Sequence, residues 1–357
     1  MKLPIIGMIG SHSAEEIGMA AKANGFRTVI VCQRGREHLY TQFNRHLYDE
    51  FIILESFKDI LQEDIQKRLE ELNTLWIPNR SFSVYVGYDG IENEFRIPLY
   101  GNRHVLRVED RGQPKDQCWL LKQSGIRTPK SFTPDSIDSL AIIKVQQKNN
   151  QLERAFFFAN SQSDYEIESK KLLKAGIISE EDLEEATIEE FVIAPRFNAN
   201  FQAYGMAHVL GDFDFVGFDD RIQTNLSGLL NLPAKEQLKL EIAVVNEEIG
   251  HKGVTMRESK KPLVYETAAL LLKGIKEYFP PKMIGLFSLQ GAITESSEFV
   301  VFDLSPRVPG APCVGPTSPE MRRLSLKFKA DIQSPLDLCM LDIKAAAEEK
   351  CLDEVST

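Results

Sequence analysis

Polar residues in two alternating runs near the C-terminal end could together hold a metal ion. The alternation predicts two antiparallel strands joined at the polar tetrapeptide 295–298. With the turn centred there, Gln290 lies opposite Asp303, and Ser288 lies opposite Ser305 on the same face. Opposed Cβ atoms are about 4.5–5.5 Å apart, and Mg²⁺ prefers oxygen ligands. The pattern predicts either a Mg²⁺ site or an ordinary strand pair with one solvated face.

The tripeptide Ser11-His12-Ser13 separates the first predicted strand from the first predicted helix. Backbone N–H groups at a helix N-terminus favour an anion such as phosphate, and His12 could add a donor. Ser13 and Glu16 have the spacing of a capping box. We therefore expect either a phosphate site or a plain helix cap with an exposed histidine.

Two further polar runs are candidates for binding loops. The first, 78–82, follows a strand and contains Arg80, which could bind a phosphate or carboxylate with two hydrogen bonds. The second, 217–225, offers Arg221 and Asn225 as ligands. Turn residues and an ordinary surface loop are the alternatives.

Lys115 and Lys144 are candidate phosphate ligands. Lys144 is the stronger candidate because it follows three apolar residues of a predicted strand, 140–145. A solvent-facing lysine is the alternative. The acidic and apolar segment 189–193 could offer backbone groups to an adenine ring, although the pattern is common.

Alternating strands and helices in the first hundred residues predict a parallel sheet. Ligands of such sheets bind beyond the carboxyl ends of the strands, where the loops 10–13, 33–37 and 78–81 lie. The expected strands are 5–9, 28–32, 51–54 and 74–77, and the expected helices are 13–25 and 59–72.

The rest of the chain has a different texture. A helix over 115–130, strands 140–145, 154–159 and 186–193, and two short helices predict a small α+β module. Beyond it we expect a helix over 262–278, the opening strand pair and a final helix over 336–355. The predicted domains are therefore 1–104, 105–193 and 194–357.

Composition excludes several classes of protein. The chain has 357 residues and a formal net charge of −10, which disfavours nucleic-acid binding. It contains no apolar run long enough for a membrane span, and we expect no signal peptide. Five dispersed cysteines without zinc spacing predict a reduced, cytoplasmic protein.

Taken in order, these pieces resemble an ATP-grasp ligase with an N-terminal Rossmann-like α/β domain. The resemblance is carried by the paired lysines, the hinge 190–193 and the C-terminal acidic strand pair. A narrower set resembles the archaeal PurP family, the formate-dependent ligases that convert AICAR to its 5-formamido product, FAICAR, in purine synthesis. That set is Gly10-Ser-His-Ser-Ala14, Pro78-Asn-Arg-Ser-Phe82, Val86-Gly-Tyr-Asp89, Asn93-Glu-Phe95, Tyr100-Gly-Asn-Arg103, Asp220-Arg-Ile-Gln-Thr-Asn225 and Phe302-Asp-Leu-Ser-Pro-Arg307.

The resemblance implies a role for individual residues. AICAR would be held by His12, Ser81 and Asn225, and Mg²⁺ or Mn²⁺ by Gln290 and Asp303. The implied catalytic residues are Arg221 and Arg307. ATP would contact Lys115, Lys144, Glu190, Val192 and Asn198. The expected partners are AICAR, formate and ATP, and we expect a homo-oligomer.

One segment departs from the family pattern. ATP-grasp enzymes usually close a glycine-rich loop over the phosphates, but 146–154 contains no glycine. We expect Lys148 and Arg154 to contact the β- and γ-phosphates instead. The alternative is a divergent relative, either a ligase for another carboxylate or amine or a nucleotide-binding regulatory protein without turnover.

Overall fold

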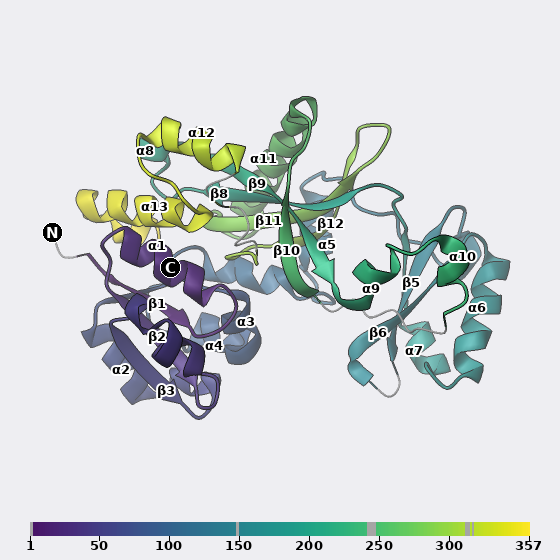
Figure 1. Cartoon of the computed structure of the whole chain (residues 1–357), viewed down its shortest axis with the longest axis horizontal. Helices are drawn as coiled ribbons and strands as arrows, with labels where there is room; N and C mark the ends of the chain where they lie inside the picture. The colour runs from purple at the N-terminus through teal and green to yellow at the C-terminus, as the bar shows by residue number, and fades with distance from the viewer. Residues whose placement is uncertain (1–2, 148–149, 241–247, 311–314, 316–317) are drawn as a thin grey trace. The chain divides into compact units, whose positions relative to one another are not determined.

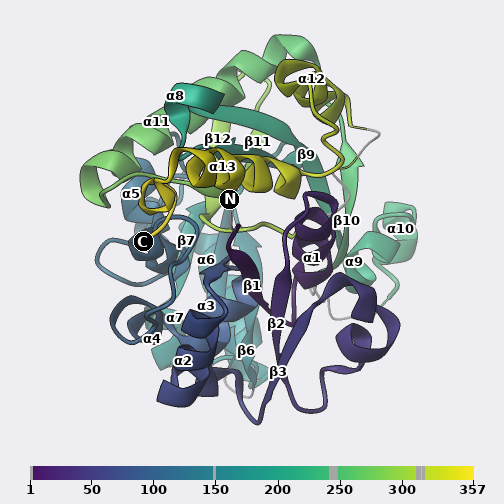
Figure 2. The same ribbon diagram turned by 90° about the vertical axis from the view of Figure 1, so that its left-hand side faces the viewer.

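A computed structural model describes residues 3–147, 150–240, 248–310, 315 and 318–357. The chain forms two compact units, shown in Figures 1 and 2. The first unit contains Met1–Ile126, Arg196–Gly291 and Asp303–Thr357, and the second contains Arg127–Pro195 and Ala292–Phe302. The division into 1–104, 105–193 and 194–357 stays a prediction.

The N-terminal part of the first unit is a four-stranded sheet, and its strands are parallel, as the sequence predicted; their order is β3-β2-β1-β4. The expected helix over 59–72 is instead a 3₁₀ turn, Phe57–Leu61, followed by α2, because Ser56 and Asp59 form a capping box at the turn. The elements here are β1 (Ile5–Ile9), α1 (Ala14–Ala23), β2 (Thr28–Gln33), β3 (Glu50–Leu54), α2 (Glu63–Glu71), β4 (Thr74–Trp76), α3 (Arg80–Val86), α4 (Tyr88–Asn93) and α5 (Gln117–Gln123).

Two expectations about the loops of this sheet were wrong. Ser13 has a left-handed φ of 65° and makes no side-chain cap. Its hydroxyl lies 3.2 Å from Nδ1 of His12 and donates to the carbonyl of Pro309 at 3.4 Å, so the predicted capping box does not form. The segment 78–82 is not a free loop, because Asn79 caps α3 by accepting from the backbone N–H of Phe82 at 3.0 Å.

The remainder of the first unit is built on a second sheet, with strand order β10-β9-β8-β11-β12. The polar run 217–225, expected to be a loop, mostly belongs to strand β9, where Asp219 pairs with Asn198 and Arg221 pairs with His251. Sheet pairing therefore carries these polar side chains across neighbouring strands. The elements are β8 (Arg196–Ala203), α8 (Ala207–Leu210), β9 (Phe213–Gln223), α9 (Thr224–Leu229), α10 (Ala234–Gln237), β10 (Glu248–Val254), α11 (Lys261–Tyr278), β11 (Gly285–Ile293), β12 (Phe299–Ser305), α12 (Pro319–Phe328) and α13 (Pro335–Glu349).

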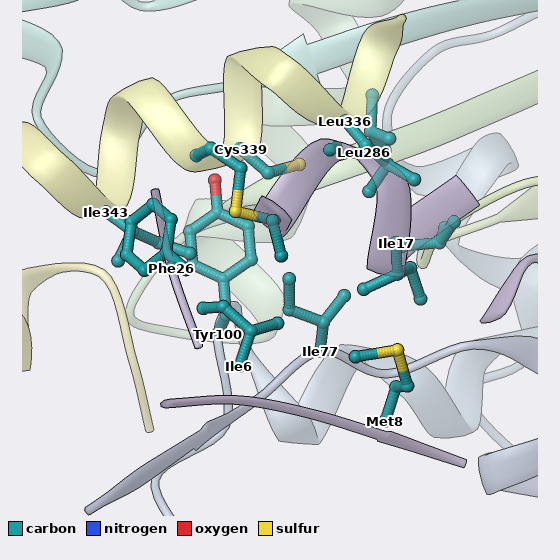
Figure 3. Packing of buried hydrophobic residues seen from close by; sticks show 14 of the residues in the cluster. Ile6, Met8, Ile17, Phe26, Ile77, Tyr100, Leu286, Leu336, Cys339 and Ile343 are labelled. Atoms are coloured by element: carbon teal, nitrogen blue, oxygen red, sulfur yellow. The ribbon is translucent and has the colours of Figure 1, made fainter. Parts of the chain in front are cut away.

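One hydrophobic cluster joins the two sheets of the first unit. Figure 3 shows Ile6 and Met8 from β1, Ile17 from α1, Leu286 from β11 and Leu336 from α13 within this cluster. Each of these side chains is buried, and full burial of such a side chain stabilises a fold by about 1.5–3 kcal/mol. The cluster therefore fixes the end of β1 against the second sheet.

The strand pair β11–β12 confirms the predicted pair of strands but has a different turn. The backbone N–H of Thr294 donates to the carbonyl of Glu298 at 3.0 Å, and Ser297 adopts a φ of 66°. Thr294 therefore faces Glu298, which shifts the centre of the turn from the predicted position. The direct pairing of Gln290 with Asp303 stays a prediction.

The second unit contains a three-stranded antiparallel sheet in the order β6-β5-β7. Its elements are β5 (Ala141–Gln147), β6 (Asn150–Ala159), α6 (Gln162–Lys174), α7 (Glu180–Glu184) and β7 (Thr187–Glu190). The predicted strand over 186–193 ends at Glu190. In the described part of the chain, no helix combines the length and apolar character that crossing a bilayer requires.

Candidate functional site

A polar cavity of about 340 Å³ lies in the first unit, above one face of the five-stranded sheet. It brings together nine of the residues selected from the sequence, namely His12, Arg80, Asn198, Arg221, Ser288, Gln290, Asp303, Ser305 and Arg307. Its wall is completed by Glu109, Asn200, Asp219, His251, Pro309 and Gly310. All five strands of the sheet contribute a side chain to it.

The buried side chain of Asn79 joins three of the segments around this cavity. Its Nδ2 donates to the carbonyls of Ile9 at 3.3 Å and Ser11 at 3.2 Å. Its backbone forms an isolated parallel bridge with Val308. The segments that follow β1, β4 and β12 are therefore held side by side, and they position His12, the start of α3 and Arg307. Ser81 lies in the first turn of α3 and is 7% exposed.

Glu109 forms the centre of a charged cluster that the sequence analysis missed. Its carboxylate accepts two hydrogen bonds from Arg307, Nη2 to Oε1 at 2.6 Å and Nε to Oε2 at 3.2 Å. Arg80 approaches the same carboxylate at 3.4 Å. Burial lowers the pKa of Arg80 and the charge of Glu109 raises it, with a net increase. The cluster therefore holds the guanidinium groups of Arg80 and Arg307 beside one carboxylate at the cavity wall.

Gln117 attaches this cluster to strand β12. Its Nε2 donates to the carbonyl of Glu109 at 3.1 Å, and its Oε1 accepts from the backbone N–H of Leu304 at 2.7 Å. Because β12 is an edge strand, the N–H of Leu304 would otherwise lack a partner from the sheet. The bond fixes the backbone between Asp303 and Ser305, both of which face the cavity. Asp303 itself lies 3.6 Å from Arg111.

A second network is centred on Asp219, whose side chain is fully buried. Its Oδ2 accepts from Asn198 at 2.7 Å, its Oδ1 accepts from Asn200 at 2.6 Å, and Nδ1 of His251 lies 2.5 Å from Oδ2. A buried carboxylate is tolerated where such partners satisfy it. Asp219 therefore orients three side chains of the cavity wall.

His12 and His251 come together at Gly310. A Cβ atom at position 310 would lie 3.0 Å from Nε2 of His12 and 3.2 Å from Nε2 of His251. The two rings therefore approach the same point of the backbone, and a side chain at 310 would displace at least one of them. His251 was missed by the sequence analysis. Its partner Asp219 is 32 residues away, and neither residue has a diagnostic spacing.

The oxygen atoms available for a cation come from Gln290, Asp303, Ser288 and Ser305. Within the described ranges, no three His, Cys, Asp or Glu side chains gather as a metal cluster. Mg²⁺ bound together with a nucleotide needs only one or two carboxylates, since phosphate and water supply its other ligands. The donor set thus fits a nucleotide complex of Mg²⁺ or Mn²⁺, and it does not fit a zinc or copper site, which would need nitrogen or sulfur ligands.

Comparison with known proteins shows the family of the chain. A relative from Methanopyrus kandleri is 38% identical over 306 residues, 85% of this chain and 83% of the relative, and is named 5-formaminoimidazole-4-carboxamide-1-(beta)-D-ribofuranosyl 5'-monophosphate synthetase. A relative of the same name from Methanococcus vannielii is 33% identical over 352 residues, 98% of this chain and 94% of the relative. The chain belongs to this synthetase family, the PurP family.

Two family models match parts of the chain, and solved structures show its fold. Residues 164–357 match "Domain of unknown function (DUF1297)", and residues 6–132 match "Protein of unknown function (DUF1246)". The crystal structure of the IMP biosynthesis protein PurP from Thermococcus kodakaraensis aligns with a TM-score of 0.72 and 21% identity over 99% of this chain and all of that one. An ADP complex of N5-carboxyaminoimidazole ribonucleotide synthetase aligns with a TM-score of 0.57 and 14% identity, over 87% of this chain and 73% of that one. The fold is the expected ATP-grasp fold.

Three residues that the PurP resemblance assigned to ATP lie in the second unit. Lys144 forms an ion pair with Glu189 at 2.5 Å. Glu190 accepts from Arg127 at 2.7 Å and from the backbone N–H of Lys130 at 3.0 Å. Burial raises the pKa of Glu190, but the hydrogen bonds from Arg127 and from the Lys130 backbone, together with the charges of these two residues, lower it by more in sum, so the pKa lies below its ordinary value. Val192 is half-buried, and its carbonyl accepts from Ala194.

For most of the remaining predicted residues, the side chain lies outside the described part of the chain. Lys115 is exposed in the first unit, with its Nζ 5.6 Å from the centre of the Trp119 ring. The backbone of Asn225 belongs to α9, but its side chain lies outside the described part of the chain. Lys148 and the side chain of Arg154 lie outside it as well.

Proposed function

We propose that the protein is an ATP- and formate-dependent ligase that converts AICAR to FAICAR. The observation that carries the proposal is the cavity that gathers His12, Gln290, Asp303 and three arginines from distant parts of the chain. The names of the relatives support it, since they describe synthetases of the formylated nucleotide. A cytoplasmic location and a homo-oligomeric state belong to the same proposal.

The reaction would proceed through formyl phosphate. An oxygen of formate attacks the γ-phosphorus of ATP, and ADP leaves with the electrons of the broken P–O bond. The exocyclic amine of AICAR then attacks the formyl carbon, phosphate leaves, and the nitrogen loses a proton. Because negative charge accumulates on the transferred group, fixed positive charges accelerate such a step.

Arg307 and Arg221 would supply those positive charges. Arg307 is 8% exposed and is held by Glu109 at two points, so it is fixed in position before any substrate binds. A preorganised guanidinium requires little reorganisation during the reaction. Arg221 lines the same cavity from β9.

Gln290 and Asp303 would hold Mg²⁺ or Mn²⁺ through one amide oxygen and one carboxylate. The ion, when bound, neutralises phosphate charge. Asp303 needs a defined backbone position for this role, and the bond from Leu304 to Gln117 supplies it. Arg111 balances the charge of Asp303 in the absence of a cation.

The 5′-phosphate of AICAR would lie between the segment 11–13 and the N-terminus of α3. Asn79 holds these two segments together, and backbone N–H groups at a helix start favour phosphate. His12 would donate to this phosphate, and Ser81 and Asn225 would complete the AICAR site. ATP would contact Lys115, Lys144, Glu190, Val192 and Asn198.

One observation favours the alternative of a nucleotide-binding regulatory protein. Lys144 and Glu190, two of the residues assigned to ATP, both form ion pairs within the second unit. ATP would have to replace or share these partners. A protein in which they persisted would bind nucleotides without phosphoryl transfer.

An assay of product and ADP distinguishes these functions. The protein would be incubated with ATP, AICAR and formate, with each substrate omitted in turn and with acetate in place of formate. We expect FAICAR and stoichiometric ADP only when all three substrates are present. Tight binding of AICAR and ATP without ADP under any condition supports the regulatory function. ADP formation when acetate replaces formate, but not when formate is present, supports a ligase for another carboxylate.

A further inference from the structure

Two buried polar atoms of the cavity wall lack a protein partner. Within the described part of the chain, Oδ1 of Asn200 and Oγ of Ser288 accept or donate no hydrogen bond. Asn200 is 1% exposed and Ser288 is 2% exposed, and both line the polar cavity. They lie on the neighbouring strands β8 and β11. Leaving such a buried group unpaired costs about 1–3 kcal/mol.

The orientation of the Asn200 amide is fixed by its other end. Nδ2 donates to Oδ1 of Asp219 at 2.6 Å and to the carbonyl of Gly217 at 3.3 Å. Both partners are acceptors, so reversing the amide would place Oδ1 against a carboxylate and a carbonyl oxygen. Asn200 must therefore present Oδ1, a pure acceptor, on its other side.

We propose that Asn200 and Ser288 recognise the edge of the substrate heterocycle that carries the amine and the carboxamide. Oδ1 of Asn200 accepts an N–H of the exocyclic amine, and Oγ of Ser288 donates to the carboxamide oxygen. The inference rests on the proposed function, because it identifies the part of AICAR that these two atoms contact. It adds a pair of specificity residues to the residues already proposed to bind AICAR, which are His12, Ser81 and Asn225.

The same geometry predicts which nucleotides are rejected. A ring with a carbonyl oxygen or a C–H group in place of the amine cannot donate to Oδ1 of Asn200. An oxygen in that position would face the fixed acceptor and leave both groups unpaired. The wall therefore favours a primary amine over an oxo group, and it does so through an amide that cannot reverse.

Ser288→Ala is the principal test, with Ser83→Ala as its matched control. Ser83 is also 2% exposed, and its hydroxyl has no partner among the described residues, but it lies on α3 and does not line the cavity. The dissociation constant for AICAR would be measured by calorimetry, together with the melting temperature of each free protein. We expect S288A to weaken AICAR binding roughly threefold to tenfold, as expected for one lost hydrogen bond. We expect neither variant to lower the melting temperature.

Asn200→Ala tests the contact with the amine through the ratio of the affinities for two nucleotides, one with the amine and one without it. This variant also deprives Asp219 of a donor, so a lower melting temperature is expected and decides nothing. The informative quantity is the affinity for AICAR relative to that for imidazole-4-carboxamide ribonucleotide, which lacks the amine. We expect the wild-type protein to prefer AICAR and N200A to lose most of that preference.

The outcomes separate this inference from the proposed function. Wild-type affinity for AICAR in S288A, or an unchanged preference in N200A, overturns the inference and leaves the ligase proposal intact. A loss of affinity in S83A equal to that in S288A also overturns it. Failure of the wild-type protein to bind AICAR overturns both.

Discussion

Arg307 donates two hydrogen bonds to the carboxylate of Glu109, although the two residues are 198 positions apart in the chain. Both side chains are at most 10% exposed. Arg80 adds a second positive charge to the same carboxylate. Glu109 therefore balances the charges of Arg80 and of Arg307, and Arg307 is one of the two arginines that the proposed reaction needs at the cavity wall.

Glu109→Gln should destabilise the protein and increase the rise in melting temperature that added phosphate causes. Removing one partner of a buried ion pair leaves the other charge uncompensated, so we expect a loss of about 3–5 kcal/mol in unfolding free energy. Added phosphate would then compensate the two arginines. The measurement is thermal unfolding with and without millimolar phosphate, which should raise the melting temperature of E109Q more than that of the wild type.

The matched control is Glu92→Gln, which removes one of the two carboxylate partners of Arg107 at a more exposed site. Exposed ion pairs contribute about 0–1 kcal/mol, so E92Q should behave like the wild type in both respects. An equal phosphate response in E109Q and E92Q would show that Glu109 does not control the charge of the cavity.

Asp303→Asn should abolish metal-dependent turnover while the fold survives. The carboxylate is half-buried and its only described ion-pair partner is Arg111 at 3.6 Å, so its loss should have little effect on stability. An amide is a much weaker ligand for Mg²⁺ than a carboxylate. Gln290→Ala should be milder, because a neutral ligand is lost. Rates would be measured against Mg²⁺ concentration, and an unchanged rate in D303N at sub-saturating Mg²⁺ would remove the metal assignment.

His12→Ala should raise the KM for AICAR more than the KM for ATP. His12 lies in the segment that Asn79 holds against the start of α3, where the nucleotide phosphate is proposed to bind. Steady-state kinetics with each substrate varied would measure the difference. Comparison with the riboside, which lacks the phosphate, provides the control. Equal binding of riboside and ribotide to the wild-type protein would contradict a phosphate site.

The sequence predicted those features that depend on local pattern. The strands of the parallel sheet, the strand pair β11–β12 and helix α11 follow from alternation or helical spacing, and the structure confirms them. The capping box at Ser13 failed because the residue adopts a left-handed φ, which no local pattern revealed. The turn of the strand pair is displaced because Ser297 also adopts a positive φ.

The candidate site could be predicted only where the residues had a recognisable context. Four residues of the site acquire their roles from contacts with residues that are distant in the sequence, and no sequence spacing identifies them. They are Glu109, Asn200, Asp219 and His251. Only the folded structure reveals them, because each is a buried polar side chain with a specific partner. Gln117 is similar, since its position beside β12 follows from packing alone.

The last prediction concerns Glu16, which is buried on α1 beside Asp337 of α13. Glu16 is 7% exposed, and Asp337 is 4% exposed. Burial, and then the charge of Asp337, raise the pKa of Glu16 to about 7 from an ordinary value of 4.5. Asp337 accepts hydrogen bonds from Asn24 and from the backbone N–H groups of Gln333 and Ser334, which hold its carboxylate in place.

Between about pH 4.5 and pH 7, the folded state therefore binds one proton more than the unfolded state. The contribution of Glu16 to stability is complete below pH 4.5 and is lost as the pH rises through 7, with a slope of at most about 1.4 kcal/mol per pH unit. Glu16→Gln should remove this slope and stabilise the protein above pH 7, because it eliminates the cost of a buried charge.

Denaturant unfolding of E16Q and the wild type between pH 5 and pH 8 would measure the pH dependence of the unfolding free energy. Glu15→Gln, on the same helix but hydrogen-bonded to Asn44, is the control and should keep the wild-type slope. If the difference in unfolding free energy between E16Q and the wild type were the same at pH 5 and pH 8, Glu16 would not be protonated in the folded protein.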